Sequence, residues 1–270
     1  MEWEIDSKTD AGSARQTRCP VGLRTHRIAA AALASALLMV PSMGAAADGD
    51  AAALAKQAAA IFGPLPQNAP NPANPSSQAK IDLGRMLYYD ARLSKNHDIS
   101  CNSCHQLDRF GVDGEPTSPG HRGQRGGRNS PTVYNAALHN SQFWDGREPD
   151  VEAQAKGPVT NPIEMALPDP AAAEQVLRSI PGYRPLFQAA FPGQEQPVTF
   201  DNMALAIGAF ERELTTPGPF DDFMKGDTDA LGPDAQRGLA TFIGTGCITC
   251  HMGPTVGGTM FQKIALIEPS

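Results

Sequence analysis

Two copies of the pattern C-x-x-C-H constrain this chain more than any other feature of its sequence. The first runs from Cys101 to His105 and the second from Cys247 to His251. Two cysteines at this spacing on a helical turn reach the two vinyl groups of one haem, and the next histidine faces its iron. The motifs therefore predict two covalently attached haem c groups, held by Cys101, Cys104, Cys247 and Cys250 and ligated at iron by His105 and His251.

Other uses of paired cysteines fit this pattern less well. Zinc ribbons keep their two pairs about 15–20 residues apart, whereas these pairs lie in different halves of the chain. A thioredoxin-like redox pair does not need a histidine directly after it in both copies. An exported protein would normally oxidise such pairs to disulfides, but the two histidines favour haem attachment.

The composition agrees with a helical protein that encloses a cofactor. Aromatic residues make up only 6% of the 270 residues, which is low for a core of this size, and a bound group with a large apolar face would help to fill it. The 26 glycines and 24 prolines are spread between helical stretches and predict long loops. The formal net charge of −7 argues against nucleic acid as a partner and favours a partner with a basic face.

The first 47 residues have the pattern of a secretory signal peptide. Arg24 and Arg27 precede the apolar run 28–40, and small residues follow at Ala45 and Ala47. The run is shorter than the roughly 20 residues of a membrane-spanning helix, so cleavage is favoured over an uncleaved anchor. We therefore expect an exported protein that begins near residue 48.

Apolar residues recur at helical spacing along most of the chain, and no convincing ladder of strands is present. The helix that Ser77 can cap should bury one face made of Ala79, Leu83, Met86 and Leu87. Further helices are expected over 50–63, at the first cysteine motif, and over 151–156, 170–180, 198–214 and 233–243, with a glycine-rich loop over 111–127.

Four specific blocks lie between the two cysteine motifs. They are R-N-S-P-T-V-Y-N (128–135), Q-F-W-D-G-R (142–147), E-A-Q-A-K-G-P (152–158) and N-x-x-E-M (161–165). Together with A-R-L-S-K-N-H-D-I-S-C-N-S-C-H before them and T-F-D-N-M-A-L-A-I-G-A-F-E after them, they make the chain similar to the bacterial dihaem cytochrome c peroxidases. The resemblance covers roughly residues 50–260.

The resemblance implies an all-α fold of two cytochrome c-like haem domains with long loops, the second of them incomplete. The peroxidatic haem would belong to 48–214 and the electron-accepting haem to 215–270. The implied reaction is the reduction of hydrogen peroxide to water in the periplasm. Electrons would come from a small cytochrome c or a cupredoxin, and family members are often homodimers.

The resemblance also assigns side chains to the first haem pocket. His121, in the glycine-rich loop, matches the family's removable distal iron ligand, although by itself it would be an ordinary surface histidine. Glu164 matches the distal acid, which moves a proton from one peroxide oxygen to the other. Gln154 matches a hydrogen-bonding neighbour. Without the resemblance, Glu164 is a solvated helix-start residue and Gln154 an exposed amide.

Two further residues match positions between the haems. Trp144, which would otherwise be a core aromatic residue, matches a tryptophan on the electron path. Asn129 matches a ligand of a calcium ion, which prefers oxygen donors. His97 and His139 have no such match and are expected to be structural or surface residues.

Family members continue well past the second cysteine motif, where a methionine ligand and the remaining calcium ligands are found. We therefore expect a truncated chain, with a second haem that is five-coordinate, water- or hydroxide-ligated or loosely held, and with doubtful activity. The alternative functions are a non-enzymatic dihaem electron-transfer cytochrome and a methylamine-utilisation-type dihaem oxidase. His121, Glu164 and Gln154 argue against a pure carrier, and His121 favours the peroxidase over the oxidase.

Overall fold

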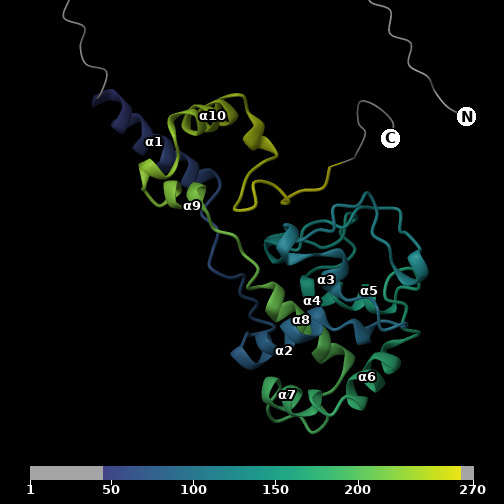
Figure 1. The fold of residues 1–270 in the computed structure, drawn as a ribbon. Helices are drawn as coiled ribbons and strands as arrows, with labels where there is room; N and C mark the ends of the chain where they lie inside the picture. The colour runs from purple at the N-terminus through teal and green to yellow at the C-terminus, as the bar shows by residue number, and fades with distance from the viewer. Residues whose placement is uncertain (1–44, 263–270) are drawn as a thin grey trace, which may run out of the picture. The chain divides into compact units, whose positions relative to one another are not determined.

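The computed structural model describes residues 45–262, and the fold within them is helical (Figure 1). Strand pairing in this range is limited to two isolated bridges, Pro119 with Arg125 and Gln142 with Glu148. The predicted all-α class is therefore confirmed. The α-helices are α1 (Ala45–Ile61), α2 (Gln78–Tyr89), α3 (Cys101–Cys104), α4 (Val151–Gln154), α5 (Lys156–Thr160), α6 (Pro170–Ser179), α7 (Tyr183–Ala190), α8 (Phe200–Glu211), α9 (Pro219–Met224) and α10 (Pro233–Gly244). The 3-10 helices are η1 (Ala91–Leu93), η2 (Leu107–Arg109), η3 (His121–Gly123), η4 (Ala136–Leu138), η5 (Thr228–Ala230) and η6 (Cys247–Thr249).

The predicted helices all have counterparts in the structure, while α5, α7 and α9 were not predicted. All three are short, and α9 begins at Pro219 within a Gly/Pro-rich stretch that resembles a loop. The predicted buried face of α2 was partly wrong. Leu83 and Leu87 are buried, but Met86 is 49% exposed. Gly84 and Tyr88 take the remaining buried places because α2 turns this side towards α8.

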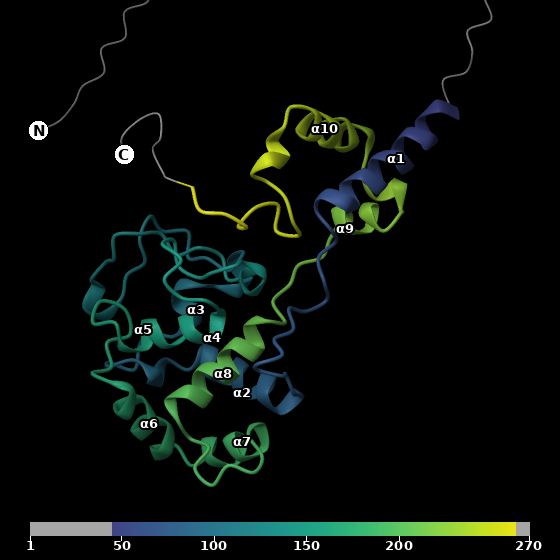
Figure 2. The same ribbon diagram turned by 180° about the vertical axis from the view of Figure 1, so that it is seen from behind.

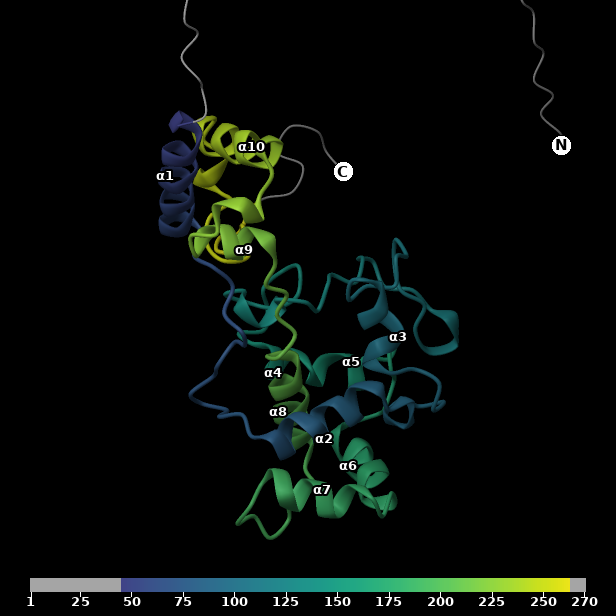
Figure 3. The ribbon, with the colours of Figure 1, turned by 60° about the vertical axis from the view of Figure 1, so that its left-hand side comes forward.

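The core of the larger helical group is the crossing of α2 and α8, which lie side by side in all three views (Figure 3). At the crossing, a Cβ atom on Gly84 would lie 1.9 Å from the carbonyl oxygen of Ala206, so only glycine fits there. Leu177 from α6 and Phe187 from α7 pack in the same apolar cluster and are fully buried. This crossing fixes α8, whose last residues face the functional site.

A buried ion pair fastens α4 to the end of α8. Arg212 Nε and Nη2 donate to Glu152 Oε1 and Oε2 at 2.8 and 2.7 Å, and Asn74 Nδ2 donates to Glu152 Oε1 at 2.8 Å. Burial opposes ionisation, but the hydrogen bonds from Arg212 and Asn74 lower the pKa of Glu152 below its usual value. A Cβ on Gly208 would lie 2.5 Å from Glu152 Cγ, so glycine leaves room for this carboxylate.

A second, smaller helical group is made of α1, α9 and α10 (Figure 2). Its apolar centre joins Ala58 and Phe62 to Met224, with Phe220 and Phe242 packed against them. The predicted division at residue 214 assigns 48–62 to the first domain, but Ala58 and Phe62 pack with α9 and α10. The reason is that Phe62 makes aromatic contacts with Phe220 and Phe242, with ring centroids 5.4 and 6.4 Å away.

The predicted signal peptide, 1–47, lies almost entirely outside the described residues. Within residues 45–262, none of the helices combines the length and the apolar character that crossing a bilayer requires.

Candidate functional site

The first cysteine motif forms α3, and His105 follows it as the C-cap residue. His105 Nδ1 lies 2.9 Å from the carbonyl oxygen of Pro131. Because a carbonyl oxygen only accepts hydrogen bonds, Nδ1 carries a proton and Nε2 is left for another partner. The Tyr88 hydroxyl donates to the carbonyl oxygen of His105 at 2.6 Å and holds the end of the motif. Burial lowers the pKa of His105, which keeps its imidazole neutral and suited to bind a metal.

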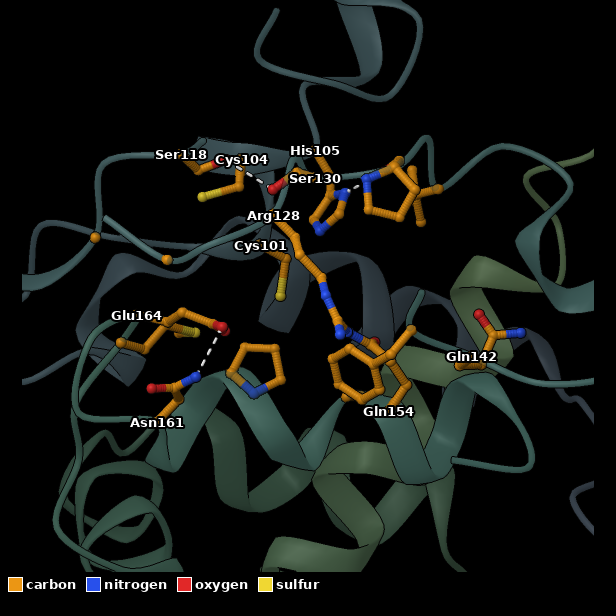
Figure 4. Close-up of a pocket in the computed structure, with 18 of the residues that line it drawn as sticks. Cys101, Cys104, His105, Ser118, Arg128, Ser130, Gln142, Gln154, Asn161 and Glu164 are labelled. Atoms are coloured by element: carbon orange, nitrogen blue, oxygen red, sulfur yellow. Dashed lines mark hydrogen bonds between the residues drawn. The ribbon is translucent and has the colours of Figure 1, made fainter. Parts of the chain in front are cut away.

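A cavity of about 470 Å³ opens beside this motif (Figure 4). This volume falls in the range of roughly 300–1,000 Å³ that is usual for cofactor pockets. Cys101, Cys104 and His105 form part of its wall, and Val151 and Ile207 contribute apolar surface. Both cysteines are free thiols. The cavity therefore fits a covalently attached haem c, because it offers two thiols at its edge, a free imidazole nitrogen and apolar walls.

The opposite wall of the cavity carries polar side chains. Figure 4 shows Gln154, Asn161 and Glu164 facing the motif residues across the cavity. Gln154 ends α4, and Glu164 lies in the turn after α5. Asn161 Nδ2 donates to Glu164 Oε1 at 2.8 Å and orients the carboxyl. Burial raises the pKa of Glu164, against the positive charge of Arg147 and the Asn161 hydrogen bond. Such a carboxyl holds a proton more readily than an exposed one and can pass it to a bound group.

His121 is buried but does not belong to the residues that line the cavity. Its backbone N–H donates to the carbonyl oxygens of Ile163 and Glu164, both at 2.8 Å. Its Nδ1 has no hydrogen-bond partner among the described residues. A Cβ on Gly120 would lie 2.0 Å from the Ile163 oxygen, so glycine permits this close docking. The loop thus lies against the segment that carries Glu164, and its role as iron ligand stays a prediction.

Trp144 and Asn129 are in contact at the rim of the cavity. Trp144 Nε1 donates to the backbone carbonyl of Asn129 at 2.8 Å, and both residues line the cavity. Trp144 is 54% exposed, so it is a rim residue and not the core aromatic residue of the alternative interpretation. Asn129 Nδ2 donates to the carbonyl of Glu115 at 2.9 Å. No cluster of three or more acidic, histidine or cysteine side chains suited to a metal occurs in the described range, so calcium binding stays a prediction.

Sequence reasoning missed a charged group at the same rim. Arg128 and Arg147 each donate to Asp145 at 2.8 Å, and both arginines line the cavity. These hydrogen bonds lower the pKa of Asp145 to about 2. The Arg147 guanidinium lies 3.4 Å from the centre of the Phe143 ring. Figure 4 shows Arg128 reaching into the space between the two walls. The signal was present in the blocks 128–135 and 142–147, which contain all three charged residues.

The second cysteine motif repeats the histidine hydrogen bond of the first, although Cys247–Thr249 form a 3-10 helix and not an α-helix. His251 Nδ1 lies 3.0 Å from the carbonyl oxygen of Val256, so Nε2 is again left free. The His251 ring packs edge-on against Phe242, with centroids 5.8 Å apart. Cys247 and Cys250 are exposed free thiols. A nearby hollow of about 260 Å³ is lined by Phe62, Phe220, Gly238, Leu239, Phe242 and Val256, which provide an apolar wall for one side of a cofactor.

Comparison with known families decides the relationship. The family model described as di-haem cytochrome c peroxidase matches residues 78–229, more than half of the chain. The chain belongs to the di-haem cytochrome c peroxidase family. It is 46% identical over 218 residues to the cytochrome c551 peroxidase of Pseudomonas aeruginosa, covering 80% of this chain and 63% of that protein. It is 46% identical over 196 residues to the cytochrome c551 peroxidase of Nitrosomonas europaea, covering 72% and 58% of the two chains.

The chain is also similar to proteins named for methylamine utilisation. The MauG protein of Methylorubrum extorquens is 38% identical over 204 residues, which cover 74% of this chain and 57% of that one. The crystal structure of a MauG-like protein associated with microbial copper homeostasis has a TM-score of 0.64 at 30% identity, covering 74% of this chain and 60% of that one. The chain thus spans about three fifths of the length of the curated relatives that it matches.

Proposed function

We propose that the chain is a periplasmic dihaem peroxidase that reduces hydrogen peroxide to water with electrons from a small cytochrome c or a cupredoxin. One haem c would be held by Cys101, Cys104 and His105, and a second by Cys247, Cys250 and His251. The first would belong to a peroxidatic domain and the second to an electron-accepting domain. The observation that carries the proposal is that one cavity joins the His105 imidazole, free at Nε2, to the acid Glu164.

The chemistry follows from the two walls of the cavity. Haem c bound there would supply a redox-active iron, with His105 as its proximal ligand. Glu164 lines the same cavity, and its raised pKa would let it accept a proton from one peroxide oxygen and return it to the other. Asn161 holds the carboxyl in place, and Gln154 offers an amide to the same space. Each turnover consumes one peroxide, two electrons and two protons and forms two waters.

The rim supports haem binding and electron entry. Arg128 and Arg147 place two guanidinium groups at the cavity, which are suited to pair with the carboxylates of a haem. Trp144 lies at the same rim, and its place on the electron path is part of the proposal. The calcium site at Asn129 and a homodimer remain predictions of the family resemblance.

Peroxide-dependent oxidation of a reduced small cytochrome c tests the function. We expect wild-type protein with haem at both motifs to catalyse it. Replacement of the general acid–base group in Glu164→Gln should lower turnover by about 10²–10⁴-fold without loss of haem. Glu213→Gln, which changes an exposed carboxyl, is the matched control and should keep full activity. Wild-type rates in Glu164→Gln would contradict the role of Glu164, and an inert wild type with both haems would favour an electron carrier.

The relationship to MauG proteins makes side-chain oxidation a second candidate. The observation in its favour is the 38% identity to a methylamine utilisation protein. Incubation with peroxide and a tryptophan-containing protein substrate, followed by mass analysis, distinguishes the two functions. A peroxidase oxidises the small cytochrome and leaves the substrate mass unchanged.

A further inference from the structure

Glu211 is a buried acid in the cavity wall to which the mechanism above gives no role. It is the last residue of α8, and only 6% of its surface is accessible to solvent. It lines the cavity together with Cys101, Cys104 and His105. The α2–α8 crossing and the Glu152–Arg212 ion pair hold this end of α8 in place. Packing therefore holds the Glu211 carboxyl at the cavity.

The groups around Glu211 stabilise the charged form of its carboxyl only weakly. The titratable and charged groups that face it are Arg212 beside it, Glu152 on α4, Tyr88 on α2 and Cys101 on α3. Arg212 is already paired with both oxygens of Glu152. Within the described residues, no hydrogen bond to the Glu211 side chain stabilises its charged form. Burial, and next the negative charge of Glu152, raise the pKa of Glu211 to about 8, against the attraction of Arg212.

We propose that Glu211 is the proton-binding group that couples electron uptake at the first haem to proton uptake from solvent. The proposal deepens the function above and rests on haem binding at Cys101 and Cys104. Glu211 takes up a proton when an electron arrives at the neighbouring haem, because the added negative charge disfavours a second negative charge in a buried site. The electron comes from the external donor, the proton from solvent, and one O–H bond forms on the carboxylate.

The coupling has a definite sign. Ionised Glu211 stabilises the oxidised, more positive haem, whereas neutral Glu211 does not. The reduction potential of the first haem therefore falls as the pH rises through the pKa of Glu211. The limiting slope is about 59 mV for each tenfold change in proton concentration in a one-electron couple. Coupling of this kind brings a proton to the cavity with the electron, as a reaction that consumes both requires.

A redox titration of the full haem-loaded chain between about pH 6 and pH 9 tests the proposal. The haem content is first measured by mass, so that failure to bind haem, which would overturn the proposed function itself, is seen separately. In the wild type, the potential of the first haem should fall with pH and approach the limiting slope. In Glu211→Gln, the potential should be independent of pH over the same window.

Three further variants assign the effect. Glu211→Asp keeps a carboxyl, so the potential should still depend on pH, with a shifted midpoint. If Glu211→Gln does not fold, this shift in midpoint is the test. Glu213→Gln should keep the wild-type slope because its carboxyl is exposed, and Glu164→Gln should keep it because Glu211 remains. A flat wild-type titration, or an unchanged slope in Glu211→Gln, would overturn the proposal.

Discussion

The two C-x-x-C-H motifs share the hydrogen bond made by their histidine and differ in their surroundings. In both, the histidine Nδ1 bonds a backbone carbonyl five or more residues further along, at 2.9 Å for His105 and 3.0 Å for His251. The first motif borders a cavity of about 470 Å³ with an acid on its far wall. The second has exposed cysteines beside an apolar hollow of about 260 Å³. The comparison teaches that the same motif can lie beside two different pockets, so its surroundings and not the motif decide which polar groups a bound haem would meet.

The largest expected effect comes from removing the two cysteines of one motif at a time. The double variant Cys101→Ala/Cys104→Ala should lose one covalent haem and all peroxide reduction, because the cavity with Glu164 would have no iron. The matched variant Cys247→Ala/Cys250→Ala should also lose one haem, but the spectrum of the remaining haem should be that of the first site. Intact-chain mass and absorption spectra measure both. Identical remaining spectra in the two double variants would show that the surroundings do not distinguish the sites.

The next largest effect is on the free energy of unfolding, when a buried ion pair of the larger helical group is broken and compared with an exposed pair of the smaller group. Arg212→Ala leaves Glu152 buried without its cation, which should lower the free energy of unfolding by about 3–5 kcal/mol. Arg237 pairs with Asp234 on exposed α10, and Arg237→Ala should change it by less than about 1 kcal/mol. Denaturant unfolding of the two haem-loaded variants measures the difference. Equal losses would mean that the buried pair does not hold α4 against α8.

The smallest effects come from the same substitution in two helices. Gly84→Ala drives a methyl group into the backbone of Ala206 at the α2–α8 crossing and should destabilise the chain by about 1–3 kcal/mol. Gly238→Ala on α10 meets no atom within 4 Å and should stabilise the chain by roughly 0.5–1 kcal/mol, because alanine favours helix. Thermal unfolding measures both. A destabilising Gly238→Ala would reveal a contact at the hollow near His251.

Much of the fold could be predicted from the sequence, because its longer helices have apolar residues at helical spacing. The stripe of Met203, Ile207 and Phe210 in α8 is buried as that spacing requires. Short elements such as α7 and α9 were missed because a few residues do not show a period. The exposure of Met86 was also missed, since the crossing partner of α2 decides which side of that helix is buried.

Some residues of the candidate site could likewise be predicted from the sequence, and others could not. Glu164 and Gln154 could be predicted only from the family blocks, because a single acid or amide in a loop has no distinctive local pattern. The structure brings both to the cavity beside His105. It leaves His121 out of the lining and adds Arg128, Arg147 and Glu211, whose positions depend on packing between distant segments.

The sequence by itself determined two C-x-x-C-H motifs, which predict haem attachment with a histidine at each iron, and a helical fold. These properties are local, because three residues within one helical turn settle the geometry of attachment. Only the tertiary structure decided which motif has an enclosed pocket and which acids face it. Burial and the pKa of a carboxyl depend on side chains that are far apart in the sequence, as the effect of Glu152 on Glu211 demonstrates.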